Sequence, residues 1–550
     1  MAASGTVSSG SWRKGLMRQS IASFFNNRED PEKNDQAVVS ESARHESTAT
    51  SSSGGVLGGT TPTPEGGKNG RCTATTDREG TESLTSPATG PTGDDPMANK
   101  HVENGVEYKS MAWWQAGMVM VAETISLGIL ALPYAMSKIG IIPGLILLLA
   151  LGAMASYSGY VIGQFKQRFR HIHSMAGAGE VLFGRWGREI LGWGQFLFYL
   201  FIMGSHILTF SIMMNAITDH GSCTIVWMVV GTILSLACTL PRTLKNLSYY
   251  SVASFLSIIG AVMITMIGVS ITKPGFVNGH MSVRLWPQPG LSFQDGFQAV
   301  NTMVFAYAGH VAFFTFISEL RNPDDFPKAL AFLQCSDISM YIITAIVVYL
   351  YAGENVRSPA LDSASTVVKK VAYGIAIPTI AIAGVVNGHV GVKYVYVRML
   401  QHNKDDLMHR PLRPLRVRTD GVPSGWNWLG IRSYGIWVLI CTLSWLAAWV
   451  IAESVPVFGD LVGLTSALFA SWFTFGLSGM FWMRLNLLQE EGSRLKMIPV
   501  RFWTWQKTLL FLVNTLNILV AAILCFVGIY SSISSMIKNG AAKKPWSCAA

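Results

Sequence analysis

Residues 122–136 read AETISLGILALPYAM and place polar groups inside an apolar run long enough to cross a membrane. A carboxyl group (Glu123) and two hydroxyl groups (Thr124 and Ser126) precede two residues that weaken a helix (Gly128 and Pro133). Hydrocarbon offers no partner to an unpaired peptide group, so irregular backbone at this depth is tolerated only where protein encloses a cavity. The pattern predicts a helix interrupted beside a cavity, with a candidate binding segment made of Thr124, Ile125, Ser126, Leu127, Gly128 and Ile129.

A second stretch, NTMVFAYAGHVAFFTFISEL at 301–320, repeats this arrangement of small residues at mid-depth. Its centre supplies a second set of candidate binding residues, namely Phe305, Ala306, Tyr307 and Gly309, followed by His310. The two stretches belong to the first and the sixth apolar segments of the chain. Matching breaks at the start of two sets of five segments predict an inverted repeat with its site at the bilayer midplane.

Two broken helices would offer complementary chemistry. Free N–H groups at the start of a half-helix, together with its dipole, hold a carboxylate. Free carbonyl groups at the end of the other half hold an ammonium group. Together they suit a zwitterion such as an amino acid. Gly and Pro also occur in membrane helices that only pack or kink, but two interrupted helices at matching positions favour a site over packing alone.

Ionisable residues inside apolar segments are costly and are therefore functional candidates: Glu123, His206, His310 and His389. A carboxyl group in a water-poor site can hold a proton near neutral pH, and histidine exchanges protons in that range without any perturbation. We expect Glu123 or His310 to accept a driving proton. The alternative is that Glu123 ties the backbone in place and His310 bonds a neighbouring helix, and for His206 we favour such a structural role.

The elements that position these residues follow from the distribution of charge. Hydrophobic residues make up 50% of the 550 residues and charged residues only 13%, so long stretches have no polar face and lipid is the expected solvent. We therefore predict an all-α membrane protein with eleven transmembrane helices. The predicted spans are 113–137, 139–165, 189–215, 222–241, 248–272, 295–318, 330–352, 370–392, 433–452, 456–483 and 506–534.

The loops predict the orientation. Lysine and arginine gather in 166–173, 241–246, 319–328, 393–418 and 490–501, which places these loops in the cytoplasm. The N-terminus is then cytoplasmic and the C-terminus extracytosolic, with Asn246 on the side where no glycan is added.

Three parts follow along the chain: a disordered tail at 1–105, a transmembrane domain at 106–535 and a short tail at 536–550. The N-terminal tail is a candidate site for regulatory proteins. Cys223 and Cys548 both fall on the outer side, where they could pair or remain free thiols. The sequence has no CxxC pair, so no metal site is expected.

Two further classes are disfavoured. The net charge of +10 comes from cations beside apolar segments rather than on one face, so we expect lipid contacts and no nucleic acid. The sequence contains no HExxH, GxSxG or P-loop motif, so we do not expect an enzyme.

WWQAGMVMVAETISLGILALPYAM, FAYAGHVAFFTFISELRNPDDFPKAL and VAYGIAIPTIAIAGVVNGHV resemble the amino acid/auxin permease family, most closely its fungal neutral amino acid permeases. The similarity runs from about residue 107 to 534. It implies the leucine-transporter-like fold of the amino acid-polyamine-organocation superfamily, a 5+5 inverted repeat plus one extra helix. It also places Asn387, on the eighth helix, near the first helix, as a further coupling candidate.

The resemblance implies secondary active transport of neutral amino acids by proton symport, at the plasma membrane, without a cofactor. Phe305, Tyr307 and Phe313, with Met203 and Phe210 on the third span, are candidates for an apolar side-chain pocket. Two alternatives share the scaffold: a vacuolar exporter, and a sensor that binds amino acids with little transport.

Overall fold

The computed structural model describes residues 111–241, 247–277, 280–402, 428–491, 494–497, 503–540 and 544–548. The chain divides into two units, 1–90 and 91–550, and all of the described residues belong to the second. The predicted N-terminal tail and the predicted absence of a glycan at Asn246 lie outside the described residues.

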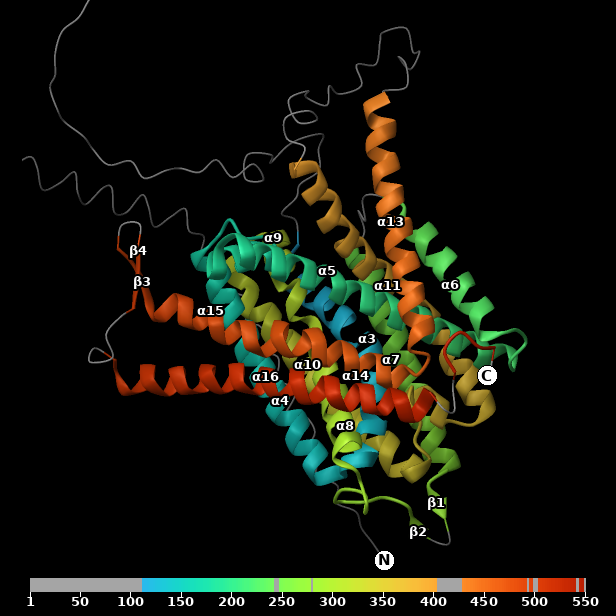
Figure 1. Ribbon diagram of the computed structural model, residues 1–550. Coiled ribbons are helices and arrows are strands. Elements are labelled where there is room, and N and C mark those ends of the chain that lie inside the picture. The colour runs from blue at the N-terminus through green and yellow to red at the C-terminus, as the bar shows by residue number, and fades with distance from the viewer. Residues whose placement is uncertain are drawn as a thin grey trace, which may run out of the picture. The chain divides into compact units, whose positions relative to one another are not determined.

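Each predicted span coincides with a helical segment of the structure, within a few residues at most ends (Figure 1). The first five are α3 (Trp113–Ile139), α4 (Ile141–Arg168), α5 (Met175–Thr218), α6 (Thr224–Thr239) and α7 (Leu247–Thr272). The sixth consists of α8 (Phe293–Phe305), the 3₁₀ helix η2 (Ala308–Ala312) and α9 (Phe313–Glu319). The others are α10 (Phe326–Ala352), α11 (Thr366–His402), α13 (Trp428–Ser454), the joined α14 (Phe458–Thr465), η6 (Ser466–Gly476) and α15 (Leu477–Asn486), and α16 (Trp505–Gly540).

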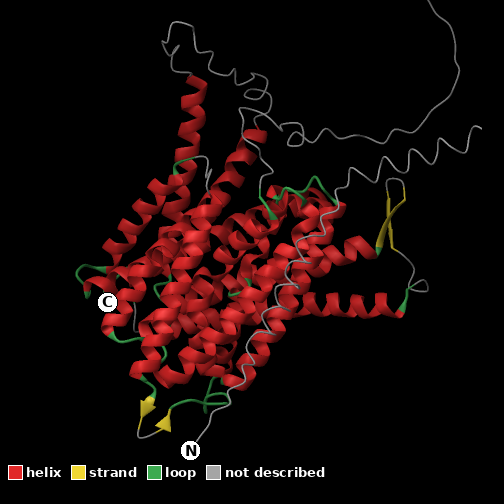
Figure 2. Cartoon of the chain, turned by 180° about the vertical axis from the view of Figure 1, so that it is seen from behind, coloured by secondary structure: helices red, strands yellow, loops and turns green. Residues whose placement is uncertain are grey.

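The helices are joined by loops and by a few strands and 3₁₀ turns (Figure 2). Two antiparallel hairpins occur, β1 (Phe276–Val277) with β2 (His280–Met281), and β3 (Leu488–Glu491) with β4 (Arg494–Met497). Three single 3₁₀ turns, η3 (Pro323–Asp325), η4 (Gly353–Asn355) and η5 (Ala360–Ser363), flank α10 and precede α11.

Nine of the described helices are long and apolar enough to cross a membrane, and the bent pair α8 and α9 makes a tenth. The remaining predicted span, α6, has 16 residues and is shorter than such a crossing requires. The structure is therefore that of a helical membrane protein, and the exact number of eleven crossings stays a prediction.

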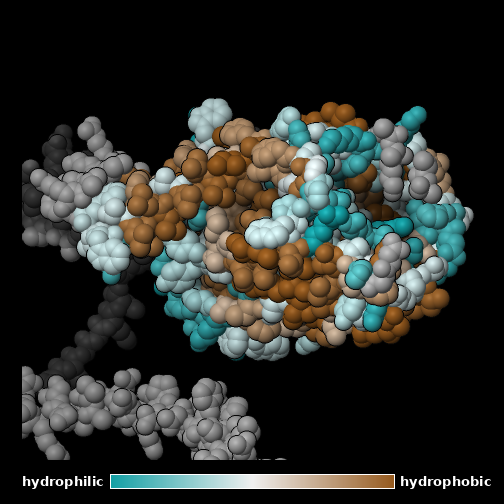
Figure 3. Space-filling model, turned by 90° about the horizontal axis from the view of Figure 1, so that it is seen from below, coloured by the Kyte–Doolittle hydropathy of each residue, from teal (hydrophilic) through white to brown (hydrophobic). Residues whose placement is uncertain are grey.

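Helix α3 lies inside the bundle and the last helix lies at its edge. In their most apolar stretches, 83% of the α3 residues are buried, against 33% for α4 and 28% for α16. The surface carries broad hydrophobic areas, as the face in Figure 3 shows. An apolar exterior suits lipid contact, and burial of α3 places its polar residues in the interior of the protein.

The predicted interruption of the first span is wrong, because α3 is one continuous helix from Trp113 to Ile139, with Pro133 inside it. The Thr124 hydroxyl donates to the Met120 carbonyl one turn earlier, at 2.8 Å. A hydroxyl that bonds a carbonyl of its own helix needs no break in the backbone. The polar residues of the first span were therefore not evidence of an interrupted helix.

The predicted interruption of the sixth span is confirmed. Helix α8 ends at Phe305, Ala306 and Tyr307 form a turn, and η2 and α9 continue with a bend of 40°. The hydroxyl of Tyr341 on α10 donates to the Ala306 carbonyl at 2.7 Å and lies 3.2 Å from the Thr124 carbonyl. A buried side chain therefore supplies a partner at the turn, where the helix leaves its carbonyls free.

Two irregular segments were not predicted. Helix α5 is kinked at Phe183 and Gly184, where Gly184 has a φ of 63°, and the predicted third span begins just after this kink. The middle of the tenth span, η6, is π-helical over 11 residues and packs against η2 and α16. Neither feature changes hydrophobic periodicity enough to be read from the sequence.

Candidate functional site

A cavity lies between α3, α5, the interrupted sixth span and α11. Its walls are formed by side chains from all four elements: Glu123, Thr124, Ser126, Leu127, Gly128, Phe198, Ile202, His206, Phe305, Ala308, Gly309 and Asn387. Eight of these are among the residues predicted for binding or coupling. The first and sixth spans thus meet at one cavity, as predicted, although only the sixth is interrupted.

Glu123 is the acidic residue of this cavity, and its side chain is half-buried. No lysine or arginine of the described residues forms an ion pair with it. A carboxyl group that reaches a cavity without a fixed cation can exchange a proton or bind a cationic group that enters.

A second cavity adjoins the first at Glu123 and Asn387, which line both. Its other walls come from α7, through Ser251 and Ser254, and from α3 and α11. The Asn387 amide donates to the Ala383 carbonyl of its own helix at 2.9 Å. Glu123 therefore lines both of two adjoining cavities.

Small residues let the first and sixth spans approach each other at the cavity. A β-carbon on Gly309 would lie 2.5 Å from the Thr124 hydroxyl oxygen, closer than real β-carbons come. Gly309 is therefore needed for the contact itself, and its hydrogen leaves room for the Thr124 side chain in the cavity wall.

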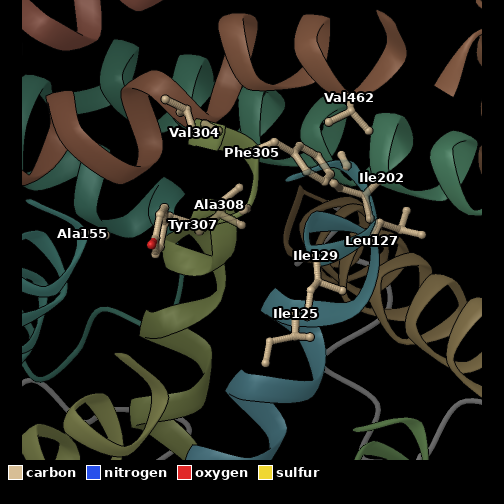
Figure 4. Close-up of a cluster of buried hydrophobic side chains, with 14 of the residues drawn as sticks. Ile125, Leu127, Ile129, Ala155, Ile202, Val304, Phe305, Tyr307, Ala308 and Val462 are labelled. Carbon is tan, nitrogen blue, oxygen red and sulfur yellow. The ribbon is translucent and has the colours of Figure 1, made fainter. Parts of the chain in front are cut away.

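Four of the predicted binding residues do not line the cavity: Ile125, Ile129, Ala306 and Tyr307. Tyr307 and Phe305 point in opposite directions from the broken segment (Figure 4). The Tyr307 hydroxyl donates to the Leu148 carbonyl of α4 at 3.0 Å, whereas Phe305 faces Leu127 and Ile202. A turn between neighbouring residues sends their side chains to different sides, which residue order alone does not show.

His310 also lies outside the cavity wall. Its ring is buried, with Nε2 at 2.8 Å from the Ala155 carbonyl and Nδ1 at 3.1 Å from the Tyr307 carbonyl. Both ring nitrogens thus face backbone acceptors, an arrangement that anchors η2 to α4.

The two other histidines differ in position. His206 lines the cavity, and its Nδ1 lies 2.9 Å from the Ile380 carbonyl of α11. His389 is buried away from the cavity, with its ring packed edge-on against Trp437.

Four cavity residues were not among those predicted for binding or coupling: Phe198, Ile202, Ala308 and His206, for which we had favoured a structural role. Phe198 and Ile202 precede His206 at intervals of four residues, so the three share one face of α5. That spacing was the available signal. Met203, Phe210 and Phe313, which we expected in the pocket, are absent from its wall and pack instead against neighbouring helices.

The comparisons with known proteins bear on this cavity. Residues 109–534 match the family described as transmembrane amino acid transporter protein. This chain belongs to that family. It is a multi-pass integral membrane protein with an amino acid as the substrate class of its family.

Several relatives cover most of the family region. The chain is 34% identical over 81% of its length to the N amino acid transport system protein of Neurospora crassa, 90% of which is covered. It is 26% identical over 72% of its length to a transmembrane transporter of Fusarium pseudograminearum, 80% of which is covered. A weaker similarity, 23% over 44% of the chain and 34% of the relative, links it to vacuolar amino acid transporter 4 of Saccharomyces cerevisiae.

Proposed function

We propose that this family member carries neutral amino acids by proton symport, with the substrate bound in the cavity between α3, α5, the sixth span and α11. The observation that carries the proposal is the composition of the wall. Leu127, Phe198, Ile202 and Phe305 supply an apolar part of the wall, which also contains a carboxyl group and small polar groups. An apolar side suits an uncharged side chain, because a charged one would need a partner there.

Among the two predicted proton acceptors, Glu123 is the better placed. It reaches both cavities, whereas the ring nitrogens of His310 face two carbonyls and the ring does not line either cavity. We therefore assign proton exchange to Glu123 and an anchoring role to His310. Asn387 shares the two cavities with Glu123 and orients this region.

The packing supports alternating access through a 5+5 repeat. Helix α3 packs on α10 and α7, and in the second half α9 packs on α4 while α8 packs on α14. These two contacts of the first span thus have counterparts made by the sixth. The turn at Ala306 and Tyr307 is the natural hinge, because its backbone is already outside regular helix.

The proposed orientation gains support from the disulfide between Cys223 and Cys548, whose sulfur atoms are joined across 325 residues of sequence. Disulfides persist on the oxidising side of a membrane, so this bond favours an extracytosolic C-terminus. We place the protein in the plasma membrane. The similarity to a protein named vacuolar amino acid transporter 4 favours the vacuolar membrane as the second candidate.

Purified full-length protein in sealed vesicles tests the proposal directly. Labelled amino acids of every side-chain class are supplied with and without an imposed pH gradient. We expect accumulation of neutral amino acids above their outside concentration only when protons flow in the same direction. Binding without accumulation would identify a sensor instead, and accumulation indifferent to pH would refute proton coupling.

Two variants distinguish Glu123 from His310 as the proton acceptor. We expect Glu123→Gln to retain exchange of labelled for unlabelled substrate but to lose accumulation driven by the pH gradient. His310→Asn is the matched variant and should keep the gradient-driven accumulation if it folds. The opposite pattern would move the coupling role from Glu123 to His310.

A further inference from the structure

Helix α10 carries a polar stripe that the site described above does not use. Gln334, Asp337, Tyr341 and Thr344 follow each other at intervals of three or four residues, so they share one face of the helix. Their exposed fractions are 5%, 0%, 0% and 1%. A fully buried polar face inside a membrane span is expensive unless it has a function.

Three members of the stripe have polar atoms without a hydrogen-bond partner among the described residues. These atoms are both carboxyl oxygens of Asp337, the amide oxygen of Gln334 and the hydroxyl oxygen of Thr344. Buried polar atoms in native proteins are almost always paired with protein or water. Four such atoms on one helix face therefore need a proton, a water molecule or an ion to satisfy them.

The stripe touches the proposed site through Tyr341. Its hydroxyl bonds the carbonyls of Ala306, at the turn of the sixth span, and of Thr124, the residue after Glu123. The ring of Tyr341 packs edge-on against the ring of Tyr307, with centroids 5.3 Å apart. Asp337 precedes Tyr341 by one helical turn on the same face and does not line either cavity.

The surroundings of Asp337 provide no compensating charge. Helix α10 packs on α3, α4 and α7, and no lysine, arginine or histidine of the described residues forms an ion pair with Asp337. On the packed elements, Glu123 lines the two cavities, the rings of Tyr307 and Tyr341 pack against each other, and His310 faces Ala155 of α4. An ionised carboxylate without a partner is strongly disfavoured here, so Asp337 must bind a proton or a small cation.

We propose that Asp337 is a second proton-binding carboxyl group, separate from Glu123 and coupled to the site through Tyr341. The proton resides on a carboxyl oxygen, and the resulting O–H group has an acceptor nearby in the unpaired amide oxygen of Gln334, one turn earlier. No covalent bond other than this O–H is made or broken. The inference rests on the proposed function, and it predicts that more than one proton accompanies each substrate molecule.

The proton-to-substrate ratio decides the question. It is measured in vesicles as the pH gradient that just balances a fixed substrate gradient and stops net flux. We expect Asp337→Asn to lower the ratio by one proton relative to the unmodified protein, and Asp337→Glu to preserve it. An unchanged ratio in Asp337→Asn would overturn the proposal.

Asp460→Asn is the matched control. Asp460 is a buried carboxyl group on α14, but its oxygens accept from Ser535 at 2.6 Å and from Asn539 at 2.8 Å. A carboxylate with donors needs no proton, so we expect Asp460→Asn to leave the ratio unchanged. A drop equal to that of Asp337→Asn would show a general effect of removing a carboxyl group, and would refute a specific role for Asp337.

An infrared measurement keeps the proposal falsifiable if Asp337→Asn fails to fold. Protonated carboxyl groups absorb separately from carboxylates, and Asp337→Glu must shift one such band of the purified protein. The absence of any shifted band refutes the protonated state. This readout does not need transport, so it separates failure of this inference from failure of proton symport. Failure of proton symport would appear as substrate accumulation by the unmodified protein that does not depend on the pH gradient.

A last experiment tests whether Asp337 binds a sodium ion instead of a proton. Flux and the infrared band are compared with sodium and with an impermeant organic cation replacing it. We expect no difference. A sodium requirement that Asp337→Asn abolishes would assign a cation to Asp337 and overturn its role as a proton site.

Discussion

Gly128 of α3 lies directly against Ala306 at the turn of the sixth span. A β-carbon on Gly128 would stand 2.8 Å from the Cα of Ala306 and 3.2 Å from its Cβ. The glycine that we interpreted as the mark of a broken helix therefore serves the close approach of two helices. The contact places the continuous α3 beside the one turn through which the sixth span can bend.

Gly128→Ala should destabilise the protein. The nearest atom is backbone, which cannot rotate away, so overpacking should cost about 1–3 kcal/mol despite the better helix propensity of alanine. The measurement is thermal unfolding of detergent-solubilised protein followed by tryptophan fluorescence. Gly374→Ala on α11 is the control, since a β-carbon there meets nothing within 4 Å. Equal melting temperatures for both variants would contradict the packing role of Gly128.

Tyr341→Phe should weaken the link between α10 and the two spans that line the cavity. The variant removes the donor to the Ala306 carbonyl while keeping the ring, and leaving this carbonyl at the break of the sixth span unpaired should cost about 1–3 kcal/mol of stability. Tyr160→Phe, on the exposed face of α4, should cost nothing measurable. If Tyr341→Phe unfolds at the temperature of the unmodified protein, the hydroxyl does not hold the turn.

Cys223→Ser should destabilise the protein by about 2–4 kcal/mol, because a cross-link that limits the unfolded chain is lost. The double variant Cys223→Ser with Cys548→Ser should be no less stable than either single variant, since all three lack the same bond. Cys335→Ser, which replaces an exposed free thiol, is the control. Thiol labelling gives an independent check, and two extra reactive thiols in the unreduced, denatured protein would show that Cys223 and Cys548 are not paired.

Ile202→Ala should widen the apolar side of the cavity. We expect the preference for large over small neutral side chains, measured as a ratio of kcat/KM values, to rise by about tenfold, the usual scale for a few methylene groups in an apolar pocket. Ile190→Ala is the control, because Ile190 lies on the same helix with 66% of its surface exposed. This variant should leave the ratio unchanged. An unchanged ratio in Ile202→Ala would place the substrate side chain elsewhere.

The sequence predicted the helices and the broken sixth span because both follow from local composition. Apolar runs of about twenty residues have few structures available in lipid, and Gly309 with the small residues around it marks a segment with weak helical preference. The sequence also indicated Glu123 at the site, since polar groups in a membrane span need an enclosed environment. Asn387 was indicated by the family resemblance, which places the eighth helix near the first.

The sequence left the pairing of Cys223 with Cys548 open, because 325 residues separate them and only the fold brings their Cα atoms to 5.0 Å. It also indicated a break in α3 that is absent. The Thr124 hydroxyl bonds a carbonyl of its own helix, and Gly128 lies against Ala306 of the sixth span. Neither contact can be predicted from the order of residues in the sequence.

The sequence by itself determined a helical membrane protein with an acidic residue in its first span and a break in its sixth. The tertiary structure decided which side chains share the cavity, because a turn sends Phe305 towards α5 and Tyr307 towards α4. It also showed that Asp337, which lies inside the predicted span 330–352 but was not among our candidates, is a buried carboxyl group without a partner among the described residues. Whether a buried polar atom has a hydrogen-bond partner depends on residues distant in sequence, and only the packing of the folded chain decides which of them lie within reach.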